Sequence, residues 1–400
     1  MDDARFERAK ALFLEGLAHF EEGRFADAVS AFEASLTFVP DRPSTLANLG
    51  AARVEAGRHA TALEPLERAI AAEPADLESR SYRGVALAAL GRYDEALATQ
   101  DAVLAQAPER AANWFRRGQV LQALERHADA LDAYDRALRL DPTLAPAWTQ
   151  KGGMLRDAGR LAEAAQAYRE ALANGGDPAL NGYYLASVDG RDTPAAAPVA
   201  YVEPFFDEYA QTFEQHLVGT LRYRAPERLV ADLVAHGPAR YASALDLGCG
   251  TGLLGALLAP IVDRLEGVDV SVRMLERARA RGVYDAFEQG DAAQVMAATS
   301  DRYDLVVAAD VFIYVGDLDP VFAGAARVLR PEGRFAFTVE AAGDAVERFV
   351  LNPSLRYAHA PGYVKALAAA HGFDVESLVR APLREEQGRP VEGCYVVLRR

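Results

Sequence analysis

The stretch Leu245–Gly255, LDLGCGTGLLG, decides the fold of the second half of this 400-residue chain. A short apolar run around Asp246 predicts a buried strand, and the apolar residues after the turn predict a helix. Between them, Gly248, Gly250 and Gly252 leave the backbone free to close on a ligand, since a side chain at any of them would block the approach. The spacing differs from the G-x-G-x-x-G of dinucleotide sites. An acid beside such a turn repels phosphate, so the pattern favours a ligand with a cationic amine.

This turn resembles the first motif of the class I S-adenosylmethionine-dependent methyltransferases, D-x-G-x-G-x-G. The matching residues are Asp246, Gly248, Gly250 and Gly252. The resemblance implies that S-adenosylmethionine is the cofactor and that its amino-acid end lies beside Asp246. It also places Cys249 and Leu253 in the cofactor-binding turn.

Strand and helix patterns alternate after the turn, which predicts a doubly wound parallel sheet. The second strand ends on Asp269, 23 residues beyond Asp246 (269 minus 246). An acid at about this distance holds paired ribose hydroxyls in nucleotide-binding folds, because a carboxylate accepts two hydrogen bonds side by side. The resemblance implies a seven-stranded Rossmann-like sheet whose last strand is antiparallel.

The resemblance also assigns further cofactor contacts along this sheet. Val270 and Met274 are expected against the adenine, and Asp291 with Ala292 at its exocyclic amine. The fourth strand is an uninterrupted apolar run, as a buried central strand requires. Its end, Asp310-Val311, is expected beneath the cofactor.

An aromatic segment precedes the glycine turn. Residues 203–217, EPFFDEYAQTFEQHL, predict a helix with a stripe of aromatic side chains. Such a stripe is also typical of a helix that packs on a core. Many small-molecule methyltransferases carry a similar segment that folds over the cofactor as a lid, and by that resemblance Tyr209 reaches the methionine end.

Three residues are candidates for catalysis. His359 precedes a helix in an expected loop, and histidine accepts protons near neutral pH. His216, at the end of the expected lid, has the same chemistry. Tyr314 stands where many related enzymes carry histidine, and it suits orientation of a hydroxyl better than proton abstraction. Each histidine also has a structural interpretation, as a capping or loop residue, and Glu340 is a weaker candidate.

The N-terminal half repeats itself with a period of 34 residues. Glycine recurs at this period in the first helix of each unit, at Gly16, Gly50, Gly84, Gly118 and Gly152. Period and positions resemble the tetratricopeptide repeat, a helical hairpin whose copies stack into a superhelix. Five repeats over about 9–178 are therefore predicted. The small residues are expected where paired helices cross, against larger side chains such as Phe32, Leu66, Tyr134 and Tyr168.

The boundaries of the parts follow from composition. Residues 1–190 are expected to hold the five repeats and a capping helix, PALNGYYLASVDG. The Pro/Ala-rich segment 191–200 is the expected linker, and 201–400 the methyltransferase domain. The repeat positions that face the groove are polar: Asn48, Arg53, Arg80, Tyr82, Arg83, Asn113, Arg117 and Gln119. They predict either a peptide-binding groove or a surface for self-association.

The net charge and the cysteine content limit the classes of partner and the compartment that we expect. The formal net charge of −15 argues against binding to nucleic acid or anionic membranes. The two cysteines, Cys249 and Cys394, lie far apart, and the start of the chain has no export signal, so a cytoplasmic protein without disulfides is expected. No metal-ligand spacing is present.

Two functions remain open at this level. In one, the second domain methylates an oxygen or nitrogen on a small molecule or a protein, and the repeats recruit the substrate or a partner. In the other, the repeats are a protein-interaction scaffold, and the second domain is inactive or senses S-adenosylmethionine. The filled cofactor positions favour the first.

Overall fold

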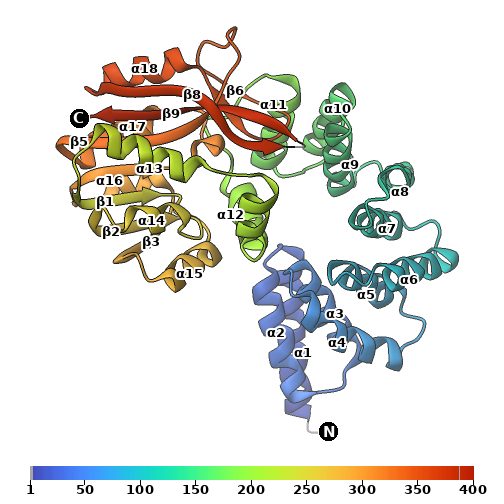
Figure 1. Ribbon diagram of the computed structural model, residues 1–400. Helices are drawn as coiled ribbons and strands as arrows, with labels where there is room; N and C mark the ends of the chain where they lie inside the picture. The colour runs from blue at the N-terminus through green and yellow to red at the C-terminus, as the bar shows by residue number, and fades with distance from the viewer. Residues whose placement is uncertain (1–2, 387) are drawn as a thin grey trace. The chain divides into compact units, whose positions relative to one another are not determined.

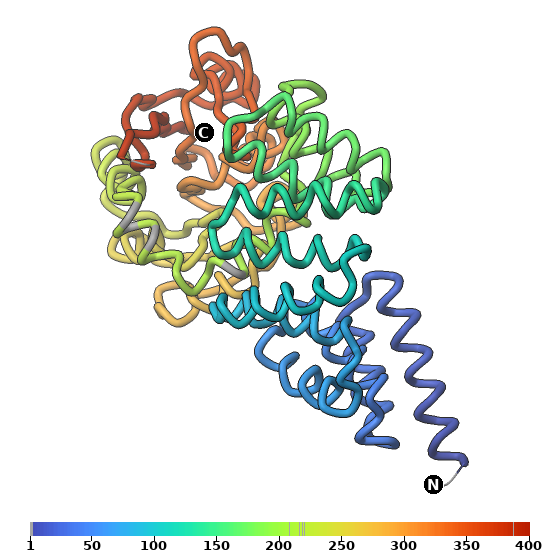
Figure 2. The backbone as a smooth tube through the Cα atoms, turned by 90° about the vertical axis from the view of Figure 1, so that its right-hand side faces the viewer, coloured from blue at the N-terminus to red at the C-terminus, as the bar shows by residue number. Residues whose placement is uncertain are grey.

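The computed structural model describes residues 3–386 and 388–400, except for the side chains of Glu208, His216, Val218 and Thr220. The chain divides into two compact units, Met1–Gly176 and Asp177–Arg400 (Figures 1 and 2). The first is all-helical and the second is an α/β unit, in agreement with the expected fold classes. Among the described residues, no helix has both the length and the apolar character needed to cross a bilayer.

The first unit consists of helical hairpins, as the 34-residue period predicts. Its helices are α1 (Asp3–Glu21), α2 (Phe25–Phe38), α3 (Pro43–Glu55), α4 (His59–Ala72), α5 (Leu77–Ala89), α6 (Tyr93–Gln106), α7 (Ala111–Ala123), α8 (His127–Leu140), α9 (Ala145–Asp157) and α10 (Leu161–Ala173). Each repeat pairs an odd-numbered helix with the even-numbered helix after it.

The repeated glycines lie where the two helices of a hairpin cross. A Cβ atom at Gly118 would come within 2.5 Å of the Tyr134 ring, so only glycine fits there. The third repeat solves the crossing differently. Gly84 faces the buried side chain of Gln100, whose amide donates to the Ser81 carbonyl at 2.6 Å. The close crossing is confirmed, and a glutamine fills the place that an aromatic or leucine side chain takes in the other repeats.

Charge pairs join each repeat to the next. Four basic residues of first helices contact acids on the preceding second helices: Arg53 with Glu33, Arg83 with Glu67, Arg117 with Asp101, and Lys151 with Asp135. The last three pairs follow one another at the 34-residue period. Three of the arginines expected to hold a peptide, Arg53, Arg83 and Arg117, are thus engaged within the repeats.

The second unit begins earlier than the composition indicated. Helix α11 (Pro178–Asp189) was expected to cap the repeats, with the boundary at 191–200, but it falls within the second unit. Its fully buried Tyr183 lies 6.2 Å from the Tyr357 ring, centroid to centroid. Further along, Ala196 forms a β-bridge with Val315. The Pro/Ala-rich segment is therefore packed against the α/β unit.

Within the described residues, the sheet has nine strands, in the order β3-β2-β1-β4-β5-β7-β6, with β9 antiparallel to β5 and β8 antiparallel to β9. The strands are β1 (Tyr241–Leu247), β2 (Val262–Asp269), β3 (Ala286–Gln289), β4 (Tyr303–Ala308), β5 (Leu329–Ala341), β6 (Phe349–Leu351), β7 (Tyr357–His359), β8 (Asp374–Glu386) and β9 (Arg389–Arg399). The expected seven strands omitted the short hairpin of β6 and β7.

Helices cover both faces of this sheet (Figure 1). One core joins the sheet to α16 (Ala292–Ala298), α17 (Asp319–Val328) and α18 (Pro361–Ala370). The other joins it to α13 (Ala225–His236) and α14 (Leu253–Leu258). The remaining elements are α12 (Val199–Tyr209), α15 (Val272–Arg281), a π-helix at Gln215–Thr220 and a 3₁₀ turn at Phe312–Tyr314. The parallel strands β1 to β4 thus end at one shared edge, where ligands bind in open α/β sheets.

Candidate active site

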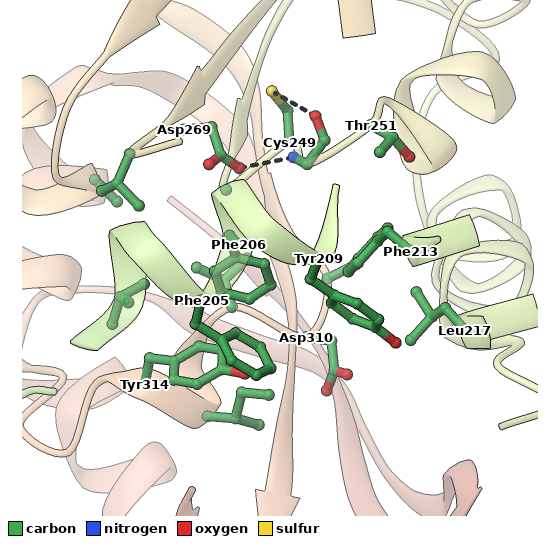
Figure 3. Close-up of a pocket in the computed structure, with 18 of the residues that line it drawn as sticks. Phe205, Phe206, Tyr209, Phe213, Leu217, Cys249, Thr251, Asp269, Asp310 and Tyr314 are labelled. Carbon is green, nitrogen blue, oxygen red and sulfur yellow. Dashed lines mark hydrogen bonds between the residues drawn. The ribbon is translucent and has the colours of Figure 1, made fainter. Parts of the chain in front are cut away.

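A pocket of about 680 Å³ lies at the carboxyl ends of the parallel strands in the second unit. One part of its wall is the glycine turn after β1 with the ends of β2 and β3, and the other part is aromatic (Figure 3). The lining includes most of the expected cofactor residues: Tyr209, Asp246, Gly248, Cys249, Gly250, Leu253, Asp269, Val270, Asp291, Ala292, Asp310 and Val311. Residues spread over 103 positions (311 minus 209, plus one) therefore meet at one pocket.

The glycines of the turn have the backbone conformation that the motif requires. Gly248, Gly250 and Gly252 have φ angles of 59°, 53° and 84°, which L side chains rarely adopt. A Cβ atom at Gly248 would lie 2.6 Å from Val311 Cγ2, whereas one at Gly250 would meet only Phe213 at 3.9 Å. Gly252 does not line the pocket, and its missing side chain makes room for Arg281 and Tyr284. The turn therefore brings bare backbone to the pocket wall.

Asp269 fixes this turn from the end of β2. Its carboxylate accepts hydrogen bonds from the Gly250 N–H at 2.8 Å and from the Ser271 N–H at 2.9 Å. Burial raises the pKa of Asp269, and these backbone donors oppose the rise. Each carboxylate oxygen has a second lone pair, so the group retains acceptor capacity for a pair of ligand hydroxyls.

Asp246 is almost fully buried and accepts a hydrogen bond from the Tyr284 hydroxyl at 2.7 Å. Burial raises the pKa of Asp246 to about 7, since the charged form loses its water. A cationic amine beside it would favour the ionised form. The position therefore suits a positively charged ligand group.

The residues expected at the adenine do not all line the pocket. Asp291 caps α16 by accepting from the Gln294 N–H at 3.0 Å, and Asp291 and Val270 both line the pocket. Met274 does not line it. This side chain is buried, and the Met274 N–H donates to the capping Ser271 hydroxyl. Met274 is thus a core residue, which corrects its expected contact with adenine.

Aromatic side chains cover the pocket opposite the glycine turn. The expected lid of residues 203–217 consists of α12 and the start of the π-helix, with a break between them. Tyr209 lies 5.2 Å from Phe213, and Phe206 lies 5.4 Å from Tyr314, ring centroid to centroid (Figure 3). Asp207 on α12 accepts a hydrogen bond from the Ser271 hydroxyl. This contact ties the aromatic helix to the end of the second strand.

The structure separates the three catalytic candidates. Tyr314 lines the pocket, and burial raises its pKa above the ordinary value. The side chain of His216 lies outside the described part of the structure. His359 ends β7 and does not line the pocket.

His359 has a structural position in place of the expected catalytic one. The imidazole is fully buried, and its Nε2 donates to the carbonyls of Val315 and Gly316 at 2.9 and 3.1 Å. Burial lowers the pKa of His359 to about 4, so the ring is neutral near pH 7. Its one donor nitrogen holds the backbone beside Tyr314.

Sequence reasoning missed two arginines in the pocket wall, Arg356 and Arg384. Arg384 lies on β8 and contacts Asp310, at the end of β4. The two residues are 74 positions apart, and neither belongs to a local motif. Only the fold brings them together.

The family comparisons agree with this arrangement. Residues 245–337 match the family model of a methyltransferase domain, and residues 4–43, 48–111 and 111–144 match models of the tetratricopeptide repeat. The chain thus joins tetratricopeptide repeats to a methyltransferase domain of the S-adenosylmethionine-dependent class.

Individual relatives share parts of this chain. Human methyltransferase-like protein 27 is 48% identical over 84 residues, which cover 20% of this chain and 34% of the relative. The malonyl-[acyl-carrier protein] O-methyltransferase of Geobacter sulfurreducens is 33% identical over 178 residues, 42% of this chain and 63% of the relative. A magnesium protoporphyrin IX methyltransferase structure from Synechocystis PCC 6803 aligns with a TM-score of 0.40 and 19% identity, covering 52% of this chain and all (100%) of that one. The matches to these two curated relatives span between 34% and 63% of the relatives' length.

Proposed function

We propose that this chain transfers a methyl group from S-adenosylmethionine to an oxygen or nitrogen atom of a small molecule or protein. The observation that carries the proposal is the pocket at the carboxyl ends of β1 to β4. Its wall combines bare glycine backbone with the buried acids Asp246 and Asp269. These acids fit the amine and the ribose of the cofactor, which supplies the reactive methyl group. Asp291, which lines the same pocket, is assigned to the adenine.

We infer that the protein orients the acceptor against the methyl group and excludes water. The aromatic wall formed by Phe205, Phe206, Tyr209 and Phe213 suits both tasks. Tyr314 faces the same space and can orient an acceptor hydroxyl or amine. In this proposal no described histidine acts as the base, since His359 is turned to backbone carbonyls.

The repeats are proposed to recruit the substrate or a partner. Their polar first-helix positions support this, although several of these side chains already have partners within the repeats. Arg53, Arg83 and Arg117 form partly exposed ion pairs, and such pairs contribute at most about 1 kcal/mol each. A peptide carboxylate therefore replaces such a partner at little cost. Self-association through the same surface is the competing proposal.

Calorimetry on the full chain tests the cofactor site directly. S-adenosylmethionine and S-adenosylhomocysteine should both bind. Asp269→Ala should weaken binding by about 1.5 to 3 kcal/mol, the range for lost hydrogen bonds to a charged group.

The control is Asp263→Ala, an exposed acid on the same strand that pairs with Arg240. It should leave cofactor affinity unchanged. Absence of cofactor binding by the unaltered chain at millimolar concentration would reject the methyltransferase proposal. Cofactor binding without methylation of any small-molecule or protein fraction would favour a scaffold that senses the cofactor.

A further inference from the structure

Five charged side chains form a cluster, and three of them, Asp310, Arg356 and Arg384, line the pocket. At the centre of the cluster is Arg384, whose side chain is 2% exposed. It donates from Nη1 to both carboxylate oxygens of Asp310 at 2.9 Å, from Nε to Glu386 at 2.8 Å, and from Nη2 to Glu340. Arg356 contacts Glu386 in turn. Arg384, Glu340 and Asp310 are the least exposed of the five, and a buried charge is costly unless it is paired, as each of these is.

Asp310 has an unusual backbone within this cluster. Its φ angle is 60°, in the left-handed region that residues other than glycine seldom adopt. The Asp310 N–H donates to the Thr338 hydroxyl at 2.8 Å, and Arg384 holds the carboxylate. Strain of this kind costs on the order of 1 to 3 kcal/mol and persists where the surroundings impose it, often at active sites. Here it turns a carboxylate toward the pocket.

The surroundings of Asp310 differ from those of the cofactor acids. In Figure 3, Asp310 and Tyr314 lie across the aromatic side chains from Asp269 and Thr251. Besides Arg356 and Arg384, the lining includes Phe206, Ile313 and Tyr314. A molecule placed here therefore has an apolar body and one polar group that meets Asp310.

The charge balance of the cluster decides which polar group fits. Two guanidinium groups, of Arg384 and Arg356, face three carboxyl groups, of Asp310, Glu340 and Glu386. Arg384 donates from Nε, Nη1 and Nη2 to carboxylates of this cluster. Burial raises the pKa of Glu340, and even its neutral form leaves two carboxylates against two guanidinium groups. No surplus positive charge remains to hold an acceptor carboxylate.

We propose that Asp310, positioned by Arg384, binds the acceptor nucleophile, and that this nucleophile is an amine or hydroxyl on an apolar body, not a carboxylate. The inference rests on the proposed methyl transfer and names its acceptor class. The acceptor N–H or O–H donates to Asp310, which aims the lone pair of the nitrogen or oxygen at the methyl group. The new bond to the methyl carbon forms as the carbon–sulfur bond breaks, and sulfur keeps that electron pair. The proton passes to the Asp310 carboxylate and then to water.

The test uses the full chain saturated with S-adenosylhomocysteine and three probes that share a phenyl body: 2-phenylethylamine, 2-phenylethanol and 3-phenylpropanoate. Binding is followed by ligand-observed NMR titration. The amine and the alcohol should bind at least about tenfold more tightly than the carboxylate, because a further anion is repelled in a poorly solvated pocket.

Asp310→Asn is the decisive variant, since asparagine tolerates the left-handed backbone. The preference over the carboxylate should shrink to within about threefold, the size of a weak polar contact. Although Asp310 is expected beneath the cofactor, its carboxylate is here assigned to the acceptor, so the affinity for S-adenosylhomocysteine should persist. An unchanged preference in this variant would overturn the inference, as would a carboxylate probe that binds as well as the others, or binding of none of the three probes.

Arg356→Gln covers the case in which the asparagine variant does not fold. If Arg356 holds an acceptor carboxylate, this change abolishes binding of 3-phenylpropanoate, and the inference fails. If Asp310 holds the acceptor, the amine and the alcohol still bind and the carboxylate probe still binds weakly.

Arg384→Lys tests whether Arg384 positions Asp310. Lysine retains one positive charge but lacks the planar guanidinium that holds Asp310, so the preference among the probes should fall while the affinity for S-adenosylhomocysteine is unchanged. If the unaltered chain does not bind S-adenosylhomocysteine, the proposed function itself is rejected.

Discussion

The hydroxyl of Tyr183 donates a hydrogen bond of 2.6 Å to the backbone carbonyl of Leu355, 172 residues further along the chain. Tyr183 is fully buried, and its ring packs with those of Tyr201 and Tyr357. This contact makes α11 part of the α/β unit. The methyltransferase domain therefore needs residues that a repeat-based division would remove.

We accordingly predict that a fragment of residues 177–400 is more stable than one of residues 201–400. The shorter fragment loses α11 and exposes the site of Tyr183, and removal of a buried aromatic side chain costs about 3 to 5 kcal/mol. Urea denaturation of the two fragments measures the difference in free energy of unfolding. Equal values would mean that α11 contributes nothing to this unit. Tyr183→Phe in the longer fragment isolates the hydrogen bond, at about 1 to 3 kcal/mol for an unsatisfied buried carbonyl.

A pair of glycine substitutions tests the geometry of the turn. Gly248→Ala should destabilise the chain more than Gly250→Ala, although both residues have positive φ angles. An alanine at either position must adopt the left-handed backbone conformation, which costs about 1 to 2 kcal/mol. Only the Gly248 variant also forces a Cβ against Val311, which adds about 1 to 3 kcal/mol of overpacking. Chemical denaturation gives the two values, and the reverse order would contradict the turn as described.

The buried His359 predicts a loss of stability in acid. Its pKa is lowered to about 4 in the folded state from an ordinary value of 6.5, so the unfolded chain binds the proton more readily. The stability that the buried neutral imidazole contributes is fully present above pH 6.5 and is lost as the pH falls through 4. The difference in pKa corresponds to about 3 kcal/mol.

His359→Gln keeps an N–H donor for the two carbonyls and removes this titration. Unfolding measured between pH 7 and 4 should therefore show a shallower decline than in the unaltered chain. His236→Gln, which replaces an exposed histidine of the same unit, is the control and should leave the decline unchanged. Parallel curves for the His359 variant and the unaltered chain would contradict the buried neutral imidazole.

The parts of the site that the sequence predicts are those held by local patterns. Asp246, the glycine turn and Asp269 lie within one strand-turn-helix-strand stretch, whose spacing alone predicts their convergence. The Arg384–Asp310 contact joins β8 to the end of β4, and Glu340 comes from β5. No spacing predicts a contact among three separate strands, because it depends on how the sheet is ordered.

The role of a side chain within a correctly predicted element depends on packing that the local pattern does not contain. Met274 follows Asp269 at the expected distance, yet it is buried in the core because the Ser271 cap fixes the start of α15. His359 has the chemistry of a base, but its environment is set by the β6–β7 hairpin, which gives no strong periodic signal over three-residue strands. The helical character of α11 was predictable, whereas the unit to which it belongs depends on long-range packing by Tyr183.

The charge pairs between successive repeats bear on how such an array changes in evolution. Arg83 with Glu67, Arg117 with Asp101 and Lys151 with Asp135 each span a junction, and the residues recur at the same 34-residue period as the glycines. Duplication or deletion of a whole 34-residue segment recreates both the glycine crossing and the charge pair at the new junction. The number of repeats can therefore change in steps of 34 residues, while an insertion of another length within a helix would move the glycine or the charged residue out of register.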